Sequence, residues 1–319
     1  LNKKIKINFI NPNNQREALI KKGMLPSQLT VEEDGKLSEA IIFPWAEIRL
    51  GKRTTIVPLL PSSIVASQEE QLQKAIGNLE YEFSNAIQTV TQQKLKKIAI
   101  LSGNGELTDI YQYSFLSAVA KKYSMAKFSL DASTINAPQT LENLSSFDLA
   151  IITKPTEKFT EKEKFVLDQF ILNGGKTLWM LDNVQADQDS LGNTGKMLAY
   201  PKDLGLTDLL FAYGIRINTS IVKDLYAAKI PVATGNIGNQ AQFKNLDWFF
   251  HPLAQGNPEN PITKNILPVR LQFANQIDTL KNNITKTPLL VSSLLTQKVG
   301  TPKIIAIQSI ADEVVESDY

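Results

Sequence analysis

Residues 97–181 alternate short apolar runs with segments of helical periodicity, and this pattern restricts the fold more than any other feature of the sequence. The apolar runs predict strands at residues 97–101, 126–130, 147–153 and 176–181. Residues 160–172 are expected to form a helix, because Thr160 and Glu163 have capping-box spacing and Gly174-Gly175 follows as a stop signal. Strands that alternate with helices predict a parallel, doubly wound sheet of the α/β class.

A different pattern occupies the first part of the chain. Short predicted strands and turns precede one long helix at residues 67–91, whose apolar side chains recur on one face. We therefore expect a small α/β domain at residues 1–92 and a larger α/β domain at residues 93–319. Within the larger domain, residues 187–200 are rich in Gly, Asn and Asp, and residues 235–265 are rich in Asn, Gly, Pro and aromatic residues. We expect both segments to be loops.

The sequence contains no cysteine and one histidine, His251. The missing cysteine excludes disulfides, iron–sulfur clusters, Cys-ligated zinc and thiol nucleophiles. A Ser-His-Asp triad or a multi-His metal site would have to use His251, which follows Trp248, Phe249 and Phe250 and is more typical of packing. We expect no metal, no cofactor and no enzymatic activity.

Charge and hydropathy limit the partners of the chain. The net charge of +2 gives no basic surface of the kind that nucleic acids require. No stretch approaches the roughly 20 apolar residues that span a bilayer. The first residues alternate like a strand rather than a signal peptide, so we expect this chain to be cut from a longer precursor.

Two glycine-rich motifs resemble nucleotide-binding loops without matching them. Gly103-Asn104-Gly105 follows a predicted strand as in a dinucleotide fingerprint, but Thr108 takes the place of the third glycine. Gly174-Gly175-Lys176-Thr177 copies the end of a phosphate-binding loop, but it lies between a helix and a strand instead of the reverse. We expect no ATP hydrolysis by this chain, so any ATPase would be another polypeptide.

Ligand contacts, if the chain has them, are expected where the parallel strands end, because open α/β sheets bind ligands at that edge. The loop and side chains that reach this edge give the candidate contact residues: Gly103, Asn104, Gly105, Glu106, Lys154 and Asp182.

Several longer segments resemble the GldG family, whose members are auxiliary components of ABC transporters associated with gliding motility. The similar segments are VEEDGK (31–36), FPW (43–45), DLAIITKPT (148–156), EKFVLDQF (163–170), NGGK (173–176), YGIRIN (213–218), VKDL (222–225) and LQFANQIDTL (271–280). They cover nearly the whole chain, and their order and spacing are more specific than either glycine-rich motif.

The resemblance implies partners and a location. It places the chain beside an ABC permease and an ATPase, on the periplasmic side of the inner membrane, in a full-length protein anchored by segments that this chain lacks. The second domain resembles the flavodoxin and class I glutamine amidotransferase-like fold, without the catalytic Cys. The first domain resembles an incomplete thioredoxin-like fold, which cannot do redox chemistry without Cys.

Three hypotheses for function follow. The first is a non-catalytic subunit, linked to gliding motility or envelope transport, that binds protein partners and predicts an exposed apolar patch. The second is a module that binds a saccharide or peptide and predicts a concave site at the strand ends. The third is a hydrolase, which predicts two cleft carboxylates at acid/base separation. The missing Cys, the single His and the lack of a catalytic motif favour the first.

Overall fold

A computed structural model describes residues 5–33, 36–60, 68–91, 96–130, 136–237, 240–264 and 266–311. The chain divides into two compact units, Leu1–Leu95 and Lys96–Tyr319. Across these described stretches, we find no helix with the length and hydropathy needed to cross a membrane.

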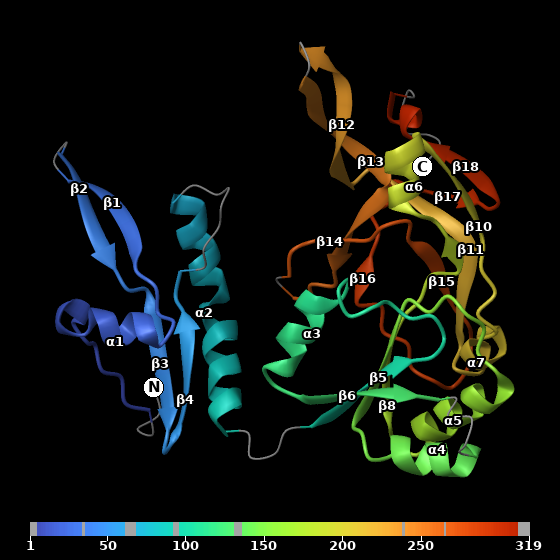
Figure 1. The fold of residues 1–319 in the computed structure, drawn as a ribbon, viewed down its shortest axis with the longest axis horizontal. Coiled ribbons are helices and arrows are strands. Elements are labelled where there is room, and N and C mark those ends of the chain that lie inside the picture. The colour runs from blue at the N-terminus through green and yellow to red at the C-terminus, as the bar shows by residue number, and fades with distance from the viewer. Residues whose placement is uncertain are drawn as a thin grey trace. The chain divides into compact units, whose positions relative to one another are not determined.

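The first unit consists of two β-hairpins and a long helix (Figure 1). Its helices and strands are the 3-10 helix Pro12–Asn14, α1 (Arg16–Lys21), β1 (Ser27–Glu33), β2 (Lys36–Ile42), β3 (Trp45–Leu50), β4 (Arg53–Pro58) and α2 (Gln68–Thr91). Both strand pairs are antiparallel, and α2 packs against β3 and β4. Ala75, Ala86 and Val90 are buried on α2, whereas Leu72 and Ile76 are exposed. The predicted apolar face of α2 is therefore only partly covered within the described part of this unit.

The second unit contains the expected parallel sheet, so the α/β class is confirmed. Its strands are β5 (Lys97–Ser102), β6 (Ser124–Ser129), β7 (Leu149–Thr153) and β8 (Lys176–Met180). They lie in the order β6-β5-β7-β8, and every neighbouring pair is parallel. The thioredoxin-like and amidotransferase-like assignments stay predictions.

Helices cover both faces of this sheet. The helices are α3 (Tyr113–Ala120), α4 (Ala137–Leu144) and α5 (Glu161–Leu172). Because side chains alternate along a strand, Leu101 and Ile152 face the core that Leu144 of α4 and Phe170 of α5 complete. Ile98, Ile100 and Ile151 pack on the other face against residues of α3.

The rest of the second unit is mainly antiparallel β-structure. Its elements are β9 (Val184–Gln185), α6 (Gln188–Thr194), β10 (Lys196–Pro201), α7 (Thr207–Ala212), β11 (Ile215–Asp224), β12 (Ala227–Ile237), β13 (Gln240–Gly256), β14 (Val269–Arg270), β15 (Asn275–Thr279), β16 (Leu290–Val291), β17 (Thr296–Gly300), β18 (Lys303–Ala306) and the 3-10 helix Ile307–Ala311. β10 lies between β9 and β18, and β11 lies between β15 and β17. A second core, with Ile221, Trp248, Phe250, Phe273 and Ile305 at its centre, holds these sheets together.

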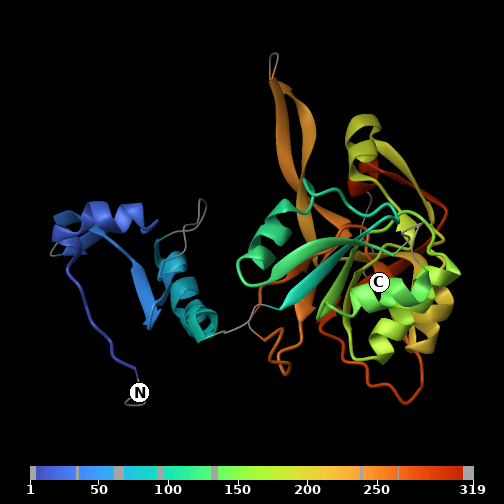
Figure 2. The ribbon, with the colours of Figure 1, turned by 60° about the horizontal axis from the view of Figure 1, so that its bottom comes forward.

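Two segments expected to be loops are regular structure. Within residues 187–200, Asp187 caps the N-terminus of α6 and Gly195 ends that helix in a left-handed conformation, before β10 begins. Residues 235–256 belong largely to the β12–β13 hairpin, which projects from this unit in both views (Figures 1 and 2). For residues 187–200 and 235–256 the loop prediction was wrong, because the glycine and polar residues serve as caps and at a register shift, next to Gly235, within an otherwise paired ladder. Residues 257–264 contain no helix or strand, as predicted.

Candidate functional site

Asn104 lies in the loop after β5, at the carboxyl end of the parallel sheet, and it is buried. Its side-chain Nδ2 donates to Oε1 of Glu163 at 3.2 Å. Its carbonyl oxygen accepts from the amides of Thr156 and Glu157, at 3.0 and 2.9 Å. Asn104 therefore joins the loop after β5 to the loop after β7 and to the start of α5.

Glu163 completes this connection. Its Oε2 accepts from the amide of Thr160 at 2.7 Å and from the Thr160 hydroxyl at 2.8 Å, as the capping-box prediction requires. Both of its carboxylate oxygens are thus occupied, one by the helix cap and one by Asn104. The hydrogen bond between Asn104 and Glu163 therefore braces this edge of the sheet.

The neighbouring candidates are also tied into this loop. The backbone amide of Asn104 donates to Oε2 of Glu106 at 2.8 Å. Gly103 and Gly105 have positive φ values of 125° and 69°, which glycine adopts without strain. A Cβ atom at Gly105 would overlap the Thr156 side chain, whose hydroxyl donates to the Gly105 carbonyl at 3.0 Å. Close packing against the chain itself accounts for both glycines.

Replacing Asn104 with alanine is expected to lower the free energy of unfolding by about 1–3 kcal/mol, because Oε1 of the buried Glu163 would lose the Asn104 donor. Urea unfolding of the full chain measures this change. Asn143→Ala is the matched control, because Asn143 is exposed on α4 and should change stability by less than about 0.5 kcal/mol. Equal stability of the two variants would contradict the bracing role of Asn104.

Lys154 and Asp182 meet at this edge, one beyond the end of β7 and the other beyond β8. Nζ of Lys154 lies 3.2 Å from Oδ2 of Asp182. Both side chains keep part of their surface exposed. The parallel topology brings this pair together, because the carboxyl ends of β7 and β8 are neighbours.

Lys202 joins the same cluster, although its sequence context did not suggest it. It follows β10, and its backbone amide donates to the carbonyl of Asn183 at 2.8 Å. Its Nζ is buried and has no hydrogen-bond partner among the described residues. Burial lowers the pKa of the Lys202 ammonium, while the Asp182 carboxylate partly offsets the shift and Lys154 adds to it.

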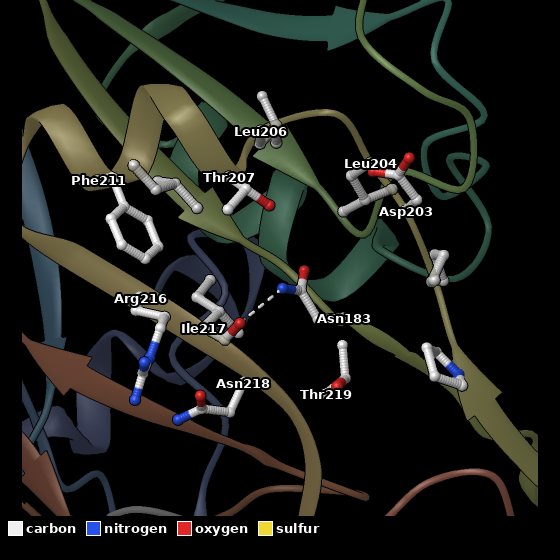
Figure 3. A pocket seen from close by; sticks show the side chains of 13 residues that line it. Asn183, Asp203, Leu204, Leu206, Thr207, Phe211, Arg216, Ile217, Asn218 and Thr219 are labelled. Carbon is white, nitrogen blue, oxygen red and sulfur yellow. Dashed lines mark hydrogen bonds between the residues drawn. The ribbon is translucent and has the colours of Figure 1, made fainter.

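A cavity of about 410 Å³ lies beside Lys202, between the end of β10, α7 and β11 (Figure 3). The residues that line it are Asn183, Pro201, Lys202, Asp203, Leu204, Leu206, Thr207, Leu210, Phe211, Arg216, Ile217, Asn218 and Thr219. Asn183 reaches across to β11, where its Nδ2 donates to the carbonyl of Ile217 at 2.9 Å. A second, more open hollow of about 530 Å³ shares Arg216, Asn218 and Thr219 with the first, so β11 forms a wall of both.

The single histidine lies elsewhere, in the second core. His251 is fully buried, and its Nδ1 lies 2.8 Å from the guanidinium of Arg270. Burial, with the Arg270 charge as a further cause, lowers the pKa of His251 to about 4, so the imidazole is neutral near pH 7. Its ring packs edge-on against Phe273, at 5.0 Å between ring centres. In the described parts of the chain, no three His, Asp or Glu side chains gather closely enough to hold a metal ion.

Residues 95–319 match the family described as ABC-type uncharacterized transport system. No curated protein matches the sequence. A solved structure titled "mmIFT52 N-terminal domain" is 17% identical, with a TM-score of 0.40 over 65% of this chain and 77% of that chain.

Proposed function

The chain belongs to the family of ABC-type uncharacterized transport systems, and we propose that it is a non-catalytic auxiliary subunit of a bacterial ABC transporter of the GldG type. In this role it binds protein partners, namely the permease and the ATPase subunits. We further propose that it serves gliding motility or envelope transport from the periplasmic side of the inner membrane, anchored by segments outside this chain. The GldG-like segments, such as residues 148–156 and 271–280, support these finer assignments.

One observation supports partner binding above the others. Leu294 is 98% exposed, on a loop whose backbone is firmly held. The fully buried Asp224, at the end of β11, accepts from the Ser293 amide at 2.8 Å and from the Ser293 hydroxyl at 2.5 Å. The carbonyl of Leu295 accepts from the Leu225 amide at 3.1 Å. We name residues 293–295 the clamped loop.

The clamped loop presents apolar surface in a fixed conformation. Leu295 is 41% exposed. Tyr226, whose amide also donates to the Asp224 carboxylate, is 42% exposed. Because hydrogen bonds already order this loop, the chain loses little conformational entropy when a partner buries Leu294. Leu294, Leu295 and Tyr226 therefore offer a partner apolar side chains to bury, which supports the partner-binding role.

Substituting Leu294 with Asp is expected to weaken binding to the permease–ATPase complex by about tenfold or more, because an apolar anchor becomes a charge that must be desolvated. Titration of the labelled chain against the reconstituted transporter measures this affinity. Leu198→Asp is the matched control, because Leu198 is 55% exposed on β10, remote in sequence from the clamped loop. Equal loss in both variants would contradict docking through the clamped loop, and no binding by the parent chain would contradict the function itself.

A ligand site at the strand ends is the second candidate function. Lys154 and Asp182 support it, because both side chains are partly exposed at that edge. Gly103, Asn104 and Gly105 give it less support, because the contacts described for them are made within the chain. Glu106 accepts from the Asn104 amide through Oε2, whereas its Oε1 is buried without a hydrogen-bond partner among the described residues.

A further inference from the structure

We propose that the open hollow over β15, β11 and β17 binds a hexuronate, a sugar that carries one carboxylate, either free or as a unit of a polysaccharide. The hollow has a volume of about 530 Å³, and every residue that lines it is polar or glycine. This inference goes beyond partner binding, because the hollow and the clamped loop are lined by different residues. It is also separate from the strand-end candidate, because that edge belongs to the parallel sheet.

The first argument concerns the backbone of β11. The pairing of β11 with β15 shifts register between Ile217 and Ile221, so that residues 218–220 lie opposite Gln276 alone. This β-bulge interrupts the alternation of side chains between the two faces of the strand. All three residues of the bulge line the hollow as a result. Bulges are frequent beside functional sites, where they redirect side chains.

The second argument concerns how the polar side chains are held. The carboxylate of Asp278 fixes three of its neighbours on β11 and β15. Nε of Arg216 donates to Oδ2 at 3.0 Å, Nδ2 of Asn218 donates to Oδ2 at 2.9 Å, and Nε2 of Gln276 donates to Oδ1 at 2.6 Å. Arg216 and Asn218 lie side by side on β11 (Figure 3). All three donor residues keep part of their surface exposed, so a ligand in the hollow can reach them.

This fixed arrangement leaves groups that match sugar hydroxyls. The side-chain oxygens of Asn218 and Gln276 remain as acceptors, and Arg216 keeps further N–H donors. The hydroxyls of Thr219 and Ser220 make no hydrogen bond to the described residues, and each can both donate and accept. A sugar hydroxyl also donates and accepts, so it needs both kinds of group within reach. No aliphatic or aromatic residue lines the hollow, which disfavours an acyl chain as the ligand.

The third argument concerns charge and space. Arg216 and Asp278 form an ion pair, so their charges balance. Lys298 is exposed on β17 and makes no ion pair with a described residue. The hollow therefore has one unbalanced positive charge, which a single carboxylate on the ligand complements. Gly300 pairs with Ser220, and a Cβ atom at Gly300 would meet no atom within 4 Å, so this part of the hollow is unfilled.

Galacturonate is the probe for this site. Galactose, which lacks the carboxylate, and hexanoate, which lacks the hydroxyls, are the comparison ligands. We expect galacturonate to bind the full chain saturably and to shift the NMR signals of the side-chain amides of Asn218 and Gln276. Galactose should bind about tenfold more weakly, because it cannot pair with Lys298. Hexanoate should leave both amide signals unchanged. Tighter binding of trigalacturonate than of galacturonate would identify a polysaccharide as the source, and equal binding would identify the free sugar.

Lys298→Met should weaken galacturonate binding by about tenfold and leave galactose binding unchanged. Lys229→Met is the matched control, because Lys229 is an exposed strand lysine on β12 that does not line the hollow. Gly300→Leu should abolish binding of both sugars by filling the open space, and its melting temperature checks that the fold is kept.

Equal affinity for galacturonate and galactose, unchanged binding in Lys298→Met or in a folded Gly300→Leu, or no saturable shift of the two amide signals would overturn the proposal. Binding of the transporter is measured separately with Leu294→Asp, so failure of the sugar site and failure of partner binding are distinguishable.

Discussion

Replacing Asp224 with alanine is expected to lower the free energy of unfolding by about 3–5 kcal/mol. The carboxylate is fully buried and accepts from the amides of Tyr226 and Ser293 and from the Ser293 hydroxyl. Removing it leaves three donors without their acceptor, each of which costs free energy when it stays shielded from water. Chemical unfolding of the parent chain and the variant measures the difference.

Asp224→Asn is the matched control for shape. It keeps an acceptor oxygen but loses the charge, and its second group becomes a donor that faces donors, so we expect a smaller but clear loss of stability. Asp224→Ala should also weaken partner binding, because it releases the loop that presents Leu294. A decrease of less than about 1 kcal/mol in the free energy of unfolding of Asp224→Ala would contradict the role of Asp224 in holding the clamped loop.

Acidification is expected to remove about 3 kcal/mol of stability through His251 alone, since one pKa unit corresponds to about 1.4 kcal/mol. Burial lowers the pKa of His251 from 6.5 to about 4 in the folded chain. The unfolded chain therefore binds a proton between these two values when the folded chain does not. The contribution is fully present above pH 6.5, falls as the pH drops toward 4, and is lost below that.

The measurement compares unfolding free energies at pH 7 and pH 4 for the parent chain and for His251→Gln, which retains a polar side chain but does not titrate. The carboxylates titrate equally in both chains, so the difference between the two pH dependences isolates His251. We expect the variant to show a pH dependence smaller by about 3 kcal/mol. Identical pH dependences would show that protonation of His251 is not linked to unfolding.

The parallel sheet could be predicted from the sequence because its signals are local. Each of β5, β7 and β8 is a short apolar run. The capping box formed by Thr160 and Glu163, a motif of four consecutive residues, marks the start of α5. The placement of Lys154 and Asp182 at one edge followed from the same reasoning, because parallel neighbours bring their carboxyl ends together. Their ion pair was not predicted.

The antiparallel part and the cavity could not be predicted in this way, because their geometry depends on pairings between distant segments. β11 pairs with β15 and β17, which lie more than 50 residues later in the chain. β10, which positions Lys202, pairs with β18 over an even longer separation. No periodicity within residues 187–202 reveals that pairing. The bracing role of Asn104 was likewise hidden, because its partner Glu163 belongs to another loop and helix.

The three tryptophans of the chain occupy three different parts of it, which makes the protein its own fluorescent reporter. Trp45 belongs to the first unit and donates to the carbonyl of Leu25, Trp179 lies on β8 and donates to the Thr177 hydroxyl, and Trp248 is 1% exposed in the second core. Indoles in such different surroundings emit at different wavelengths. Single-tryptophan variants therefore allow the melting of the first unit, of the parallel sheet and of the antiparallel core to be followed separately, without any attached dye.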